Sequence, residues 1–170
     1  DTNIFEKVLI NDFRYTTIPK ITSKGFVNKL NLLFKNVTTD SENSNEYNNT
    51  FRSQNFGSLL YDISFPMKRE GSIYDNFLSG KASFMYSPNK NKNIKNLDRK
   101  INIKNVFSQN RLGLSDSVEG GQSLTLGGEY KITDKQNNSI LTGGLASVIR
   151  DKHDEKLPIN STLNLSLIHI

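Results

Sequence analysis

Arg111, Asp116 and Glu119 are the residues of this chain whose types and spacing could do polar chemistry. A guanidinium and two carboxylates this close together can pair with one another or can present charge to a polar ligand. In a loop near a polar cavity they would have to satisfy their own groups, and so they would fold the loop onto the neighbouring structure. We favour this structural interpretation. The alternative is that they line a path for a polar ligand.

The two histidines of the chain do not indicate a catalytic site. His153 lies beside Asp151 and Asp154 in a charged turn, and His169 stands alone near the end of the sequence. Two histidines without cysteine make a poor metal site. A hydrolase would need a positioned serine and an oxyanion hole, and nothing near either histidine suggests them. We therefore expect no enzymatic activity, no metal and no cofactor.

Three glycine pairs occur in segments with strand character, at 120–121, 127–128 and 143–144. None continues into a Gly-Lys-Ser/Thr phosphate loop and none opens a helix, so nucleotide binding is not indicated. Glycine inside a strand marks a bend, a bulge or the close approach of another backbone. We interpret the pairs as curvature of a large barrel wall, with room for a plug protein as the alternative.

Alternation of apolar and polar residues dominates the elements that must position these groups. The pattern predicts seven strands, over residues 4–16, 25–37, 55–66, 75–87, 120–133, 139–150 and 162–170. Turns are expected at 68–71, 134–138 and 151–160, and a polar loop at 40–50. Residues 88–118 form a long connection with little strand character, and loops of such length are usually functional or disordered.

The alternation also predicts which residues share a face of the sheet. One continuous outer face should carry Leu59, Tyr61, Ile63, Phe65, Leu78, Phe84, Leu124, Leu126 and Tyr130. The opposite face should carry Asp62, Lys81, Thr125 and Glu129, because a slip of one residue would reverse every side chain. If the outer face meets lipid, a lysine or arginine at Leu126 should cost roughly 2–4 kcal/mol, whereas Thr125→Lys should be nearly neutral.

Strand length favours a membrane barrel over a soluble sandwich, although both produce alternation. Globular strands average about 5–6 residues, and the predicted strands are longer. Aromatic residues near strand ends suit interfacial girdles, namely Tyr61, Phe65, Phe84, Tyr86 and Tyr130. A polar-lined barrel also explains a hydrophobic content of 35% and a mean hydropathy of -0.53. No run approaches 18 apolar residues, which excludes a transmembrane helix.

The net charge and the cysteine content limit the kinds of ligand and metal site that the chain could have. The net charge is 22 − 17 = +5. Attraction to lipid phosphates is one interpretation, but the lysines gather in turns such as 89–100, and we favour a general abundance of lysine and asparagine. Cysteine is absent, so neither disulfides nor thiolate metal sites are present. The chain opens without methionine and closes apparently within a strand, and we expect it to be a fragment of a longer protein.

One long segment resembles a family pattern. Residues 105–113 (NVFSQNRLG), followed by Asp116 and Glu119-Gly-Gly-x-x-Leu124, resemble N-L-F-S-x-N-R-F-S-G-x-D-R-x-E-x-G-x-R-x-x-Y-G, a pattern of the LPS-assembly protein LptD (organic solvent tolerance protein) family. The chain departs from it at Leu112, Ser117 and Ser123. Residues 57–66 and 78–88 resemble the family's preceding strands. The motif residues matched are Asn105, Phe107, Asn110, Arg111, Gly113, Asp116, Glu119 and Gly121.

The resemblance implies an all-β fold, an antiparallel transmembrane β-barrel segment of about seven strands. Residues 1–170 would form part of the family's outer-membrane barrel domain, truncated at both ends. The implied function is not enzymatic: it is the transport of lipopolysaccharide and its insertion into the outer leaflet of the Gram-negative outer membrane. The implied partners are lipopolysaccharide, outer-membrane lipids, periplasmic Lpt bridge components and an LptE-like lipoprotein plug, with no nucleic acid. The motif residues would fold the loop or line the substrate path.

Two other functions remain open from the sequence. A different outer-membrane barrel, such as a porin or receptor, would have similar strands without the 105–119 pattern. A soluble saccharide-binding β-sandwich would bury its apolar residues between two sheets.

Overall fold

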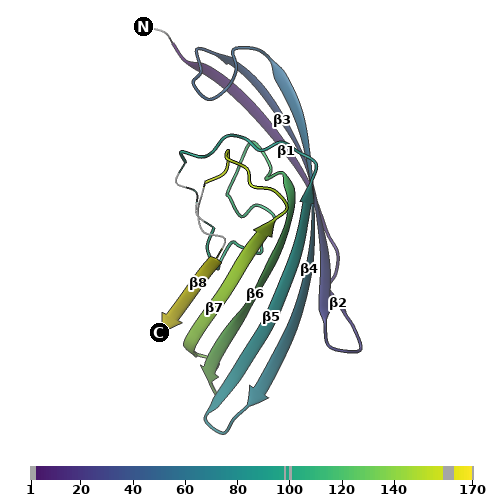
Figure 1. Cartoon of the computed structure of the whole chain (residues 1–170), viewed down its shortest axis with the longest axis vertical. Helices are drawn as coiled ribbons and strands as arrows, with labels where there is room; N and C mark the ends of the chain where they lie inside the picture. Colours follow the sequence, from purple (N-terminus) through teal and green to yellow (C-terminus); the bar gives the residue numbers. More distant parts are fainter. Residues whose placement is uncertain (1–2, 98, 100, 159–162, 170) are drawn as a thin grey trace.

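The computed structural model describes residues 3–97, 99, 101–158 and 163–169. These residues form one curved antiparallel sheet (Figure 1). The strands run along the sheet in the order β1-β3-β4-β5-β6-β7-β8, and the short β2 pairs with β3. Their bounds are β1 Phe5–Thr16, β2 Lys20–Ile21, β3 Val27–Glu42, β4 Arg52–Glu70, β5 Tyr74–Ser87, β6 Gly121–Asp134, β7 Ser139–Arg150 and β8 Leu163–His169. The predicted all-β class is therefore confirmed, and each predicted strand has a counterpart.

Several boundaries differ from the sequence-based expectation. β3 continues to Glu42, into the polar loop expected at 40–50, and β4 begins at Arg52 instead of residue 55. β2 was not predicted, and it resumes pairing with β3 after a break at Thr17–Pro19. β4 continues to Glu70, through the turn expected at 68–71. Pairing of β4 with β3 ends at Ser64, so Pro66 lies where β5 is its only neighbouring strand. The missing N–H of a proline is tolerated on such an edge. The last predicted strand extends to Thr162 and Ile170, which lie outside the described residues.

The predicted division of faces is confirmed by the register. Tyr61 lies opposite Phe84, and Phe84 lies opposite Leu124, so these three share a face. Asp62, Ser83 and Thr125 are aligned in the same way on the other face. We call the face with Tyr61 the outer face and the face with Asp62 the inner face. Large apolar side chains remain exposed on the outer face, among them Phe84, Leu124 and Leu126.

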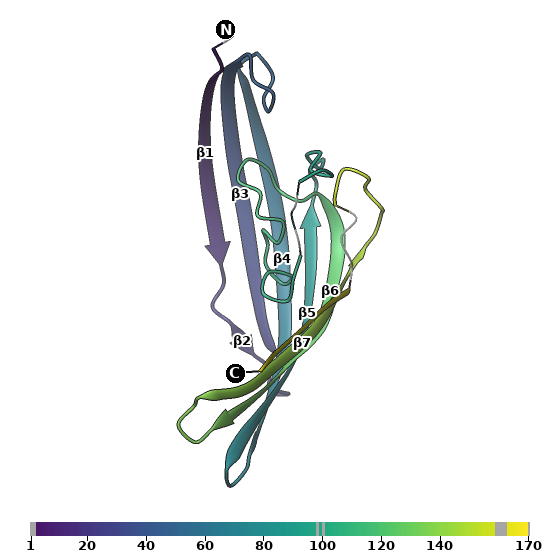
Figure 2. The same ribbon diagram turned by 90° about the vertical axis from the view of Figure 1, so that its left-hand side faces the viewer.

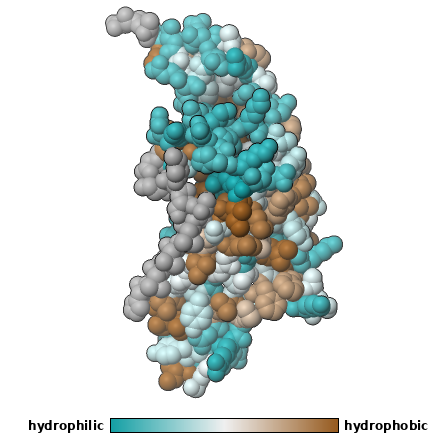
Figure 3. Space-filling model, in the orientation of Figure 1, coloured by the Kyte–Doolittle hydropathy of each residue, from teal (hydrophilic) through white to brown (hydrophobic). Residues whose placement is uncertain are grey.

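The connections differ strongly between the two ends of the sheet. β4–β5 and β6–β7 are joined by short turns at one end. The connections β3–β4, β5–β6 and β7–β8 lie at the other end, which we call the long-loop end (Figure 2). Hydrophilic residues gather over the upper part of the molecule, around these connections, and hydrophobic residues over the strands below (Figure 3). The described residues include no helix long and apolar enough to cross a membrane.

The buried apolar residues lie between the long β5–β6 connection and the inner face, because this connection folds back over the sheet (Figure 1). We call residues 88–120 the folded loop. One cluster consists of Ile94, Leu112, Leu114 and Leu157. A second consists of Val106, Ala146 and Val148. β7 approaches β6 closely here: a Cβ at Gly127 would lie 2.5 Å from the Leu145 carbonyl oxygen, so only glycine fits.

Candidate functional site

The site is built by the folded loop, which crosses the inner face instead of projecting from the sheet. Gln109 Nε2 donates to the Ser58 carbonyl oxygen in β4 at 2.9 Å. The Ile94 N–H donates to the Lys156 carbonyl oxygen in the β7–β8 connection at 2.8 Å. The two apolar clusters fill the space between these contacts. The loop is thus held at both of its sides by hydrogen bonds and below by packing.

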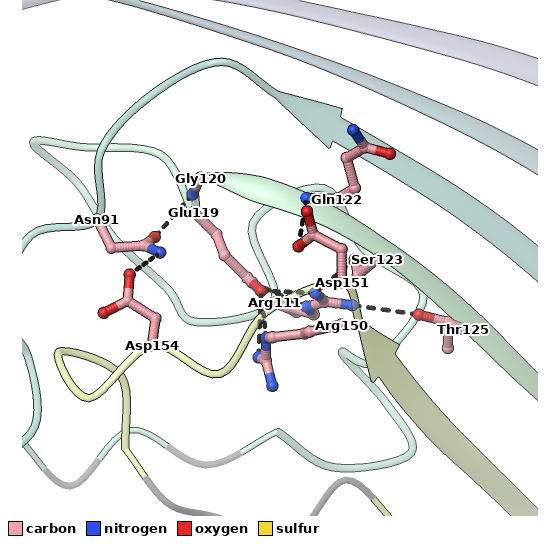
Figure 4. A network of polar contacts seen from close by, with 10 residues as sticks. All are labelled: Asn91, Arg111, Glu119, Gly120, Gln122, Ser123, Thr125, Arg150, Asp151 and Asp154. Carbon is pink, nitrogen blue, oxygen red and sulfur yellow. Dashed lines mark hydrogen bonds and ion pairs between the residues drawn. The ribbon is translucent and has the colours of Figure 1, made fainter.

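A buried ion pair lies at the centre of the site (Figure 4). Arg111 donates from Nε to Glu119 Oε2 at 2.8 Å and from Nη2 to Oε1 at 2.6 Å. This fork-to-fork geometry is the strongest arrangement for such a pair. The remaining guanidinium hydrogens reach β6, where Ser123 Oγ accepts at 2.8 Å and Thr125 Oγ1 at 3.1 Å. Arg111 is 2% exposed and Glu119 4%, so water does not screen the pair.

A second guanidinium shares the same carboxylate. Arg150, the last residue of β7, lies with Nε and Nη2 both 3.1 Å from Glu119 Oε1. Arg150 is the register partner of Ser123, which itself contacts Arg111. Glu119 therefore joins the folded loop to β6 and β7 at one point.

Asn91 ties the beginning of the folded loop to its surroundings (Figure 4). Its Nδ2 donates to Asp154 Oδ2 at 2.8 Å, and its Oδ1 accepts the Gly120 N–H at 2.7 Å. The hydrogen bond from Asn91 lowers the pKa of Asp154 below its ordinary value. The β7–β8 connection and the start of β6 are held together in this way.

Asp116 belongs to a different cluster. Lys92 Nζ lies 2.5 Å from Asp116 Oδ2 and 3.1 Å from Glu46 Oε1, and Tyr47 donates to Asp116 at 3.2 Å. Burial lowers the pKa of Lys92, but its hydrogen bonds to the two carboxylates outweigh burial and raise the pKa overall. Burial and the Asp116 charge raise the pKa of Tyr47. This cluster links the folded loop to the β3–β4 connection.

Four other motif residues shape the backbone of the loop or the entry to β6. Asn110 closes a turn by exchanging side-chain hydrogen bonds with the backbone of Leu114, at 2.9 and 2.8 Å. Asn105 Oδ1 accepts the Asn102 N–H at 2.8 Å. Gly113 has a φ of 64° and Gly121 a φ of 94°, in the left-handed region that favours glycine.

Phe107 has a packing position. It lies against the cluster of Val106, Ala146 and Val148. Lys81 Nζ is 5.9 Å from the centre of its ring, within the range of a cation–π contact.

The structure brings Arg111 and Glu119 together but places Asp116 elsewhere. The sequence analysis missed Arg150, Lys92 and Tyr47, because partners from distant elements leave no local signal. The expectation that Thr125→Lys is nearly neutral is wrong: Thr125 is 2% exposed beneath the folded loop and accepts a hydrogen bond from Arg111. The sequence predicted that Thr125 faces inward, but it did not predict that the folded loop covers this residue.

This arrangement is suited to holding the folded loop against the sheet and not to carrying out a chemical reaction. Arg111 and Glu119 are buried, and the hydrogen bonds of their side chains go to other protein side chains. Within the described ranges, no group of three or more His, Cys, Asp or Glu side chains could hold a metal ion. His153 is exposed in the β7–β8 connection.

The comparison with protein families gives one match. The model of the family LptD, described as LPS transport system D, matches residues 16–164, which is well over half of the chain. No curated protein matches the chain significantly.

Breaking the buried pair should destabilise the fold strongly. Glu119→Gln leaves the buried guanidinium of Arg111 without its carboxylate partner, and we expect a loss of about 3–5 kcal/mol in the free energy of unfolding. Denaturant titration of the full-length protein measures it, and limited proteolysis of residues 88–120 should show earlier cleavage.

The matched control is Glu70→Gln, which removes a 72% exposed carboxylate and leaves Lys68 paired with Asp75. Exposed pairs contribute only about 0–1 kcal/mol. If Glu119→Gln cost no more than Glu70→Gln, the buried pair would not anchor the loop.

Proposed function

We infer the function from the premise that this chain belongs to the LptD family, LPS transport system D. Membership indicates a part in lipopolysaccharide transport, which is a transport and assembly activity and not an enzymatic one. We propose that the chain is a wall segment of a translocon barrel in the Gram-negative outer membrane. Through this barrel lipopolysaccharide would reach the outer leaflet. The family match over residues 16–164, which contains β2 to β7, is the observation on which the proposal rests.

The outer face supports a position in the membrane. Its exposed side chains include Leu124, Leu126 and Leu145, and they lie on neighbouring strands. β5 and β6 each contain 14 residues. A tilted strand needs about 9–11 residues to cross a bilayer, so both are long enough. Apolar residues facing outward and polar residues facing inward are the pattern of a transmembrane barrel.

The open sheet supports a larger barrel. Among the described strands, β1 pairs only with β3, and β8 only with β7. Unpaired strand edges are costly in a membrane, where no water satisfies their N–H and C=O groups. We propose that residues 1–170 form an arc of a barrel domain closed by further strands.

The asymmetry of the connections supports an orientation. Barrels of the outer membrane have short periplasmic turns and longer extracellular loops. We propose that the long-loop end, with the β3–β4 connection and the folded loop, is extracellular. The short turns after β4 and β6 would then face the periplasm.

For the motif residues we propose a loop-folding role. Arg111 and Glu119 are buried, and their hydrogen bonds are directed to protein groups, which leaves little for a passing substrate. Asn110 and Gly113 support turns within the loop. The folded loop would then shape the luminal wall, and its surface, not its anchor, would meet lipopolysaccharide.

The proposed partners follow from the two faces. Outer-membrane lipids would contact the outer face. Lipopolysaccharide would pass along the inner face below the folded loop, where Lys81 and Glu129 form a half-exposed ion pair at 2.8 Å. We propose that an LptE-like lipoprotein fills the remaining lumen and that periplasmic Lpt bridge components deliver the substrate.

The two alternatives have less support. A porin or receptor would share the sheet but not the family match. A saccharide-binding sandwich requires a second sheet against the first, and the described part of the chain forms a single sheet with apolar side chains exposed.

Photocrosslinking in cells tests the function. A photoreactive residue at Lys131, on the inner face, should capture lipopolysaccharide in the full-length protein. The same residue at Tyr130, on the outer face near the short turns, should capture periplasmic-leaflet phospholipid instead. Lipopolysaccharide adducts at neither position, with normal barrel yield, would reject the transport role of this wall.

A charge on the outer face should impair membrane insertion. Leu126→Arg should cost roughly 2–4 kcal/mol if this residue lies near the bilayer midplane. Ser79→Arg is the control, because Ser79 faces inward opposite Glu129. Folding titrations of the full-length protein in lipid vesicles measure both. Equal penalties would contradict the lipid-facing assignment.

A further inference from the structure

A polar pocket lies at the long-loop end of the inner face, outside the Arg111–Glu119 anchor. Its volume is about 270 Å³. β3 and β4 contribute inward-facing residues such as Thr39 and Gln54, and the folded loop covers one side with Lys90–Lys92.

The charge still available in this pocket is positive. Its two carboxylates, Glu46 and Asp116, are both engaged by Lys92. Arg52 and Lys90 also line the pocket, and the side chain of neither forms a hydrogen bond or ion pair with the described residues. An arginine and a lysine that are free in this way suit a carboxylate or a phosphate.

Neutral groups around these cations are also unused. The side-chain amides of Asn48 and Gln54 form no hydrogen bond within the described part of the chain. Ser117 is 4% exposed, and its Oγ is buried without a partner among the described residues. Buried hydroxyls normally have one, so Ser117 marks an unfilled position beside the pocket. Phe56 adds an aromatic ring, which can cover the apolar face of a sugar.

A second polar pocket of about 470 Å³ adjoins the first and shares Lys90 and Asn91 with it. Lys152 and Lys156 of the β7–β8 connection line this second pocket. A ligand in the first pocket can therefore extend past Lys90 into another polar space, which Asp151 and Asp154 also line. Such continuity favours a chain of polar units over a single small ion.

We propose that the first pocket binds an acidic saccharide, a sugar unit bearing a carboxylate or a phosphate. Arg52 and Lys90 bind the acidic group. The amides of Asn48 and Gln54 bind ring hydroxyls, and the adjoining pocket receives the next unit of the chain. This inference rests on the proposed function for its luminal position, and it adds a discrete subsite at the outer mouth.

Ligand-observed NMR on the full-length protein in detergent tests the subsite. The probes are glucuronate, glucose 6-phosphate, glucose and inorganic phosphate. We expect one or both acidic sugars to bind at least tenfold more tightly than glucose or inorganic phosphate. The double variant Arg52→Gln/Lys90→Gln should lose at least tenfold in that affinity. The matched control, Lys24→Gln/Arg69→Gln, removes two exposed cations at the opposite end of the sheet and should change nothing.

Three results would overturn the proposal: glucose binding as tightly as both acidic sugars, inorganic phosphate binding as tightly, or acidic-sugar binding that survives the double variant. A stronger response to glucuronate than to glucose 6-phosphate identifies the acidic group as a carboxylate, and the reverse identifies a phosphate. Free sugars test only the pocket. If they did not bind, the capture of lipopolysaccharide at Lys131 would still be expected. Loss of that capture would reject the proposed function independently.

Discussion

The Glu119 carboxylate, held between the guanidiniums of Arg111 and Arg150, is the constraint on which the inner face depends. Burying an ion costs several kcal/mol unless partners surround it. Here the partners of Glu119 are Arg111 of the folded loop and Arg150 of β7, and Arg111 is in turn held by Ser123 and Thr125 of β6, so the network is complete only when all three elements are assembled. The apolar clusters on either side stabilise the folded loop by packing, but packing alone does not set its position. The directional hydrogen bonds of this network do.

Arg150 lies directly opposite Ser123 in the register of β6 and β7, and Ser123 stands where the family pattern has arginine. In this chain a guanidinium reaches Glu119 from β7. The loop it secures covers part of the inner face and leaves the polar pockets at the long-loop end open.

Much of the sheet could be predicted from the sequence. In strands such as β5 and β6, the alternation of apolar and polar residues shows directly which face each side chain lies on. The division between Tyr61 and Asp62 followed from that alternation alone. The folded loop could not be predicted in the same way. Its residues Ile94, Leu112 and Val106 lack periodicity, and their partners are distant in the sequence. Thr125 shows the consequence: its inward direction was evident, but its burial depends on Arg111 arriving from another element.

The central claim is that the folded loop lies against the inner face, and disulfide trapping tests it most directly. The sequence contains no cysteine, so pairs can be introduced cleanly. Val106→Cys with Val148→Cys places both thiols in one buried cluster, whereas Val106→Cys with Ile149→Cys places the second on the outer face. Non-reducing electrophoresis of the full-length protein should show a crosslink for the first pair only. A crosslink for the second pair, or for neither, would contradict this account.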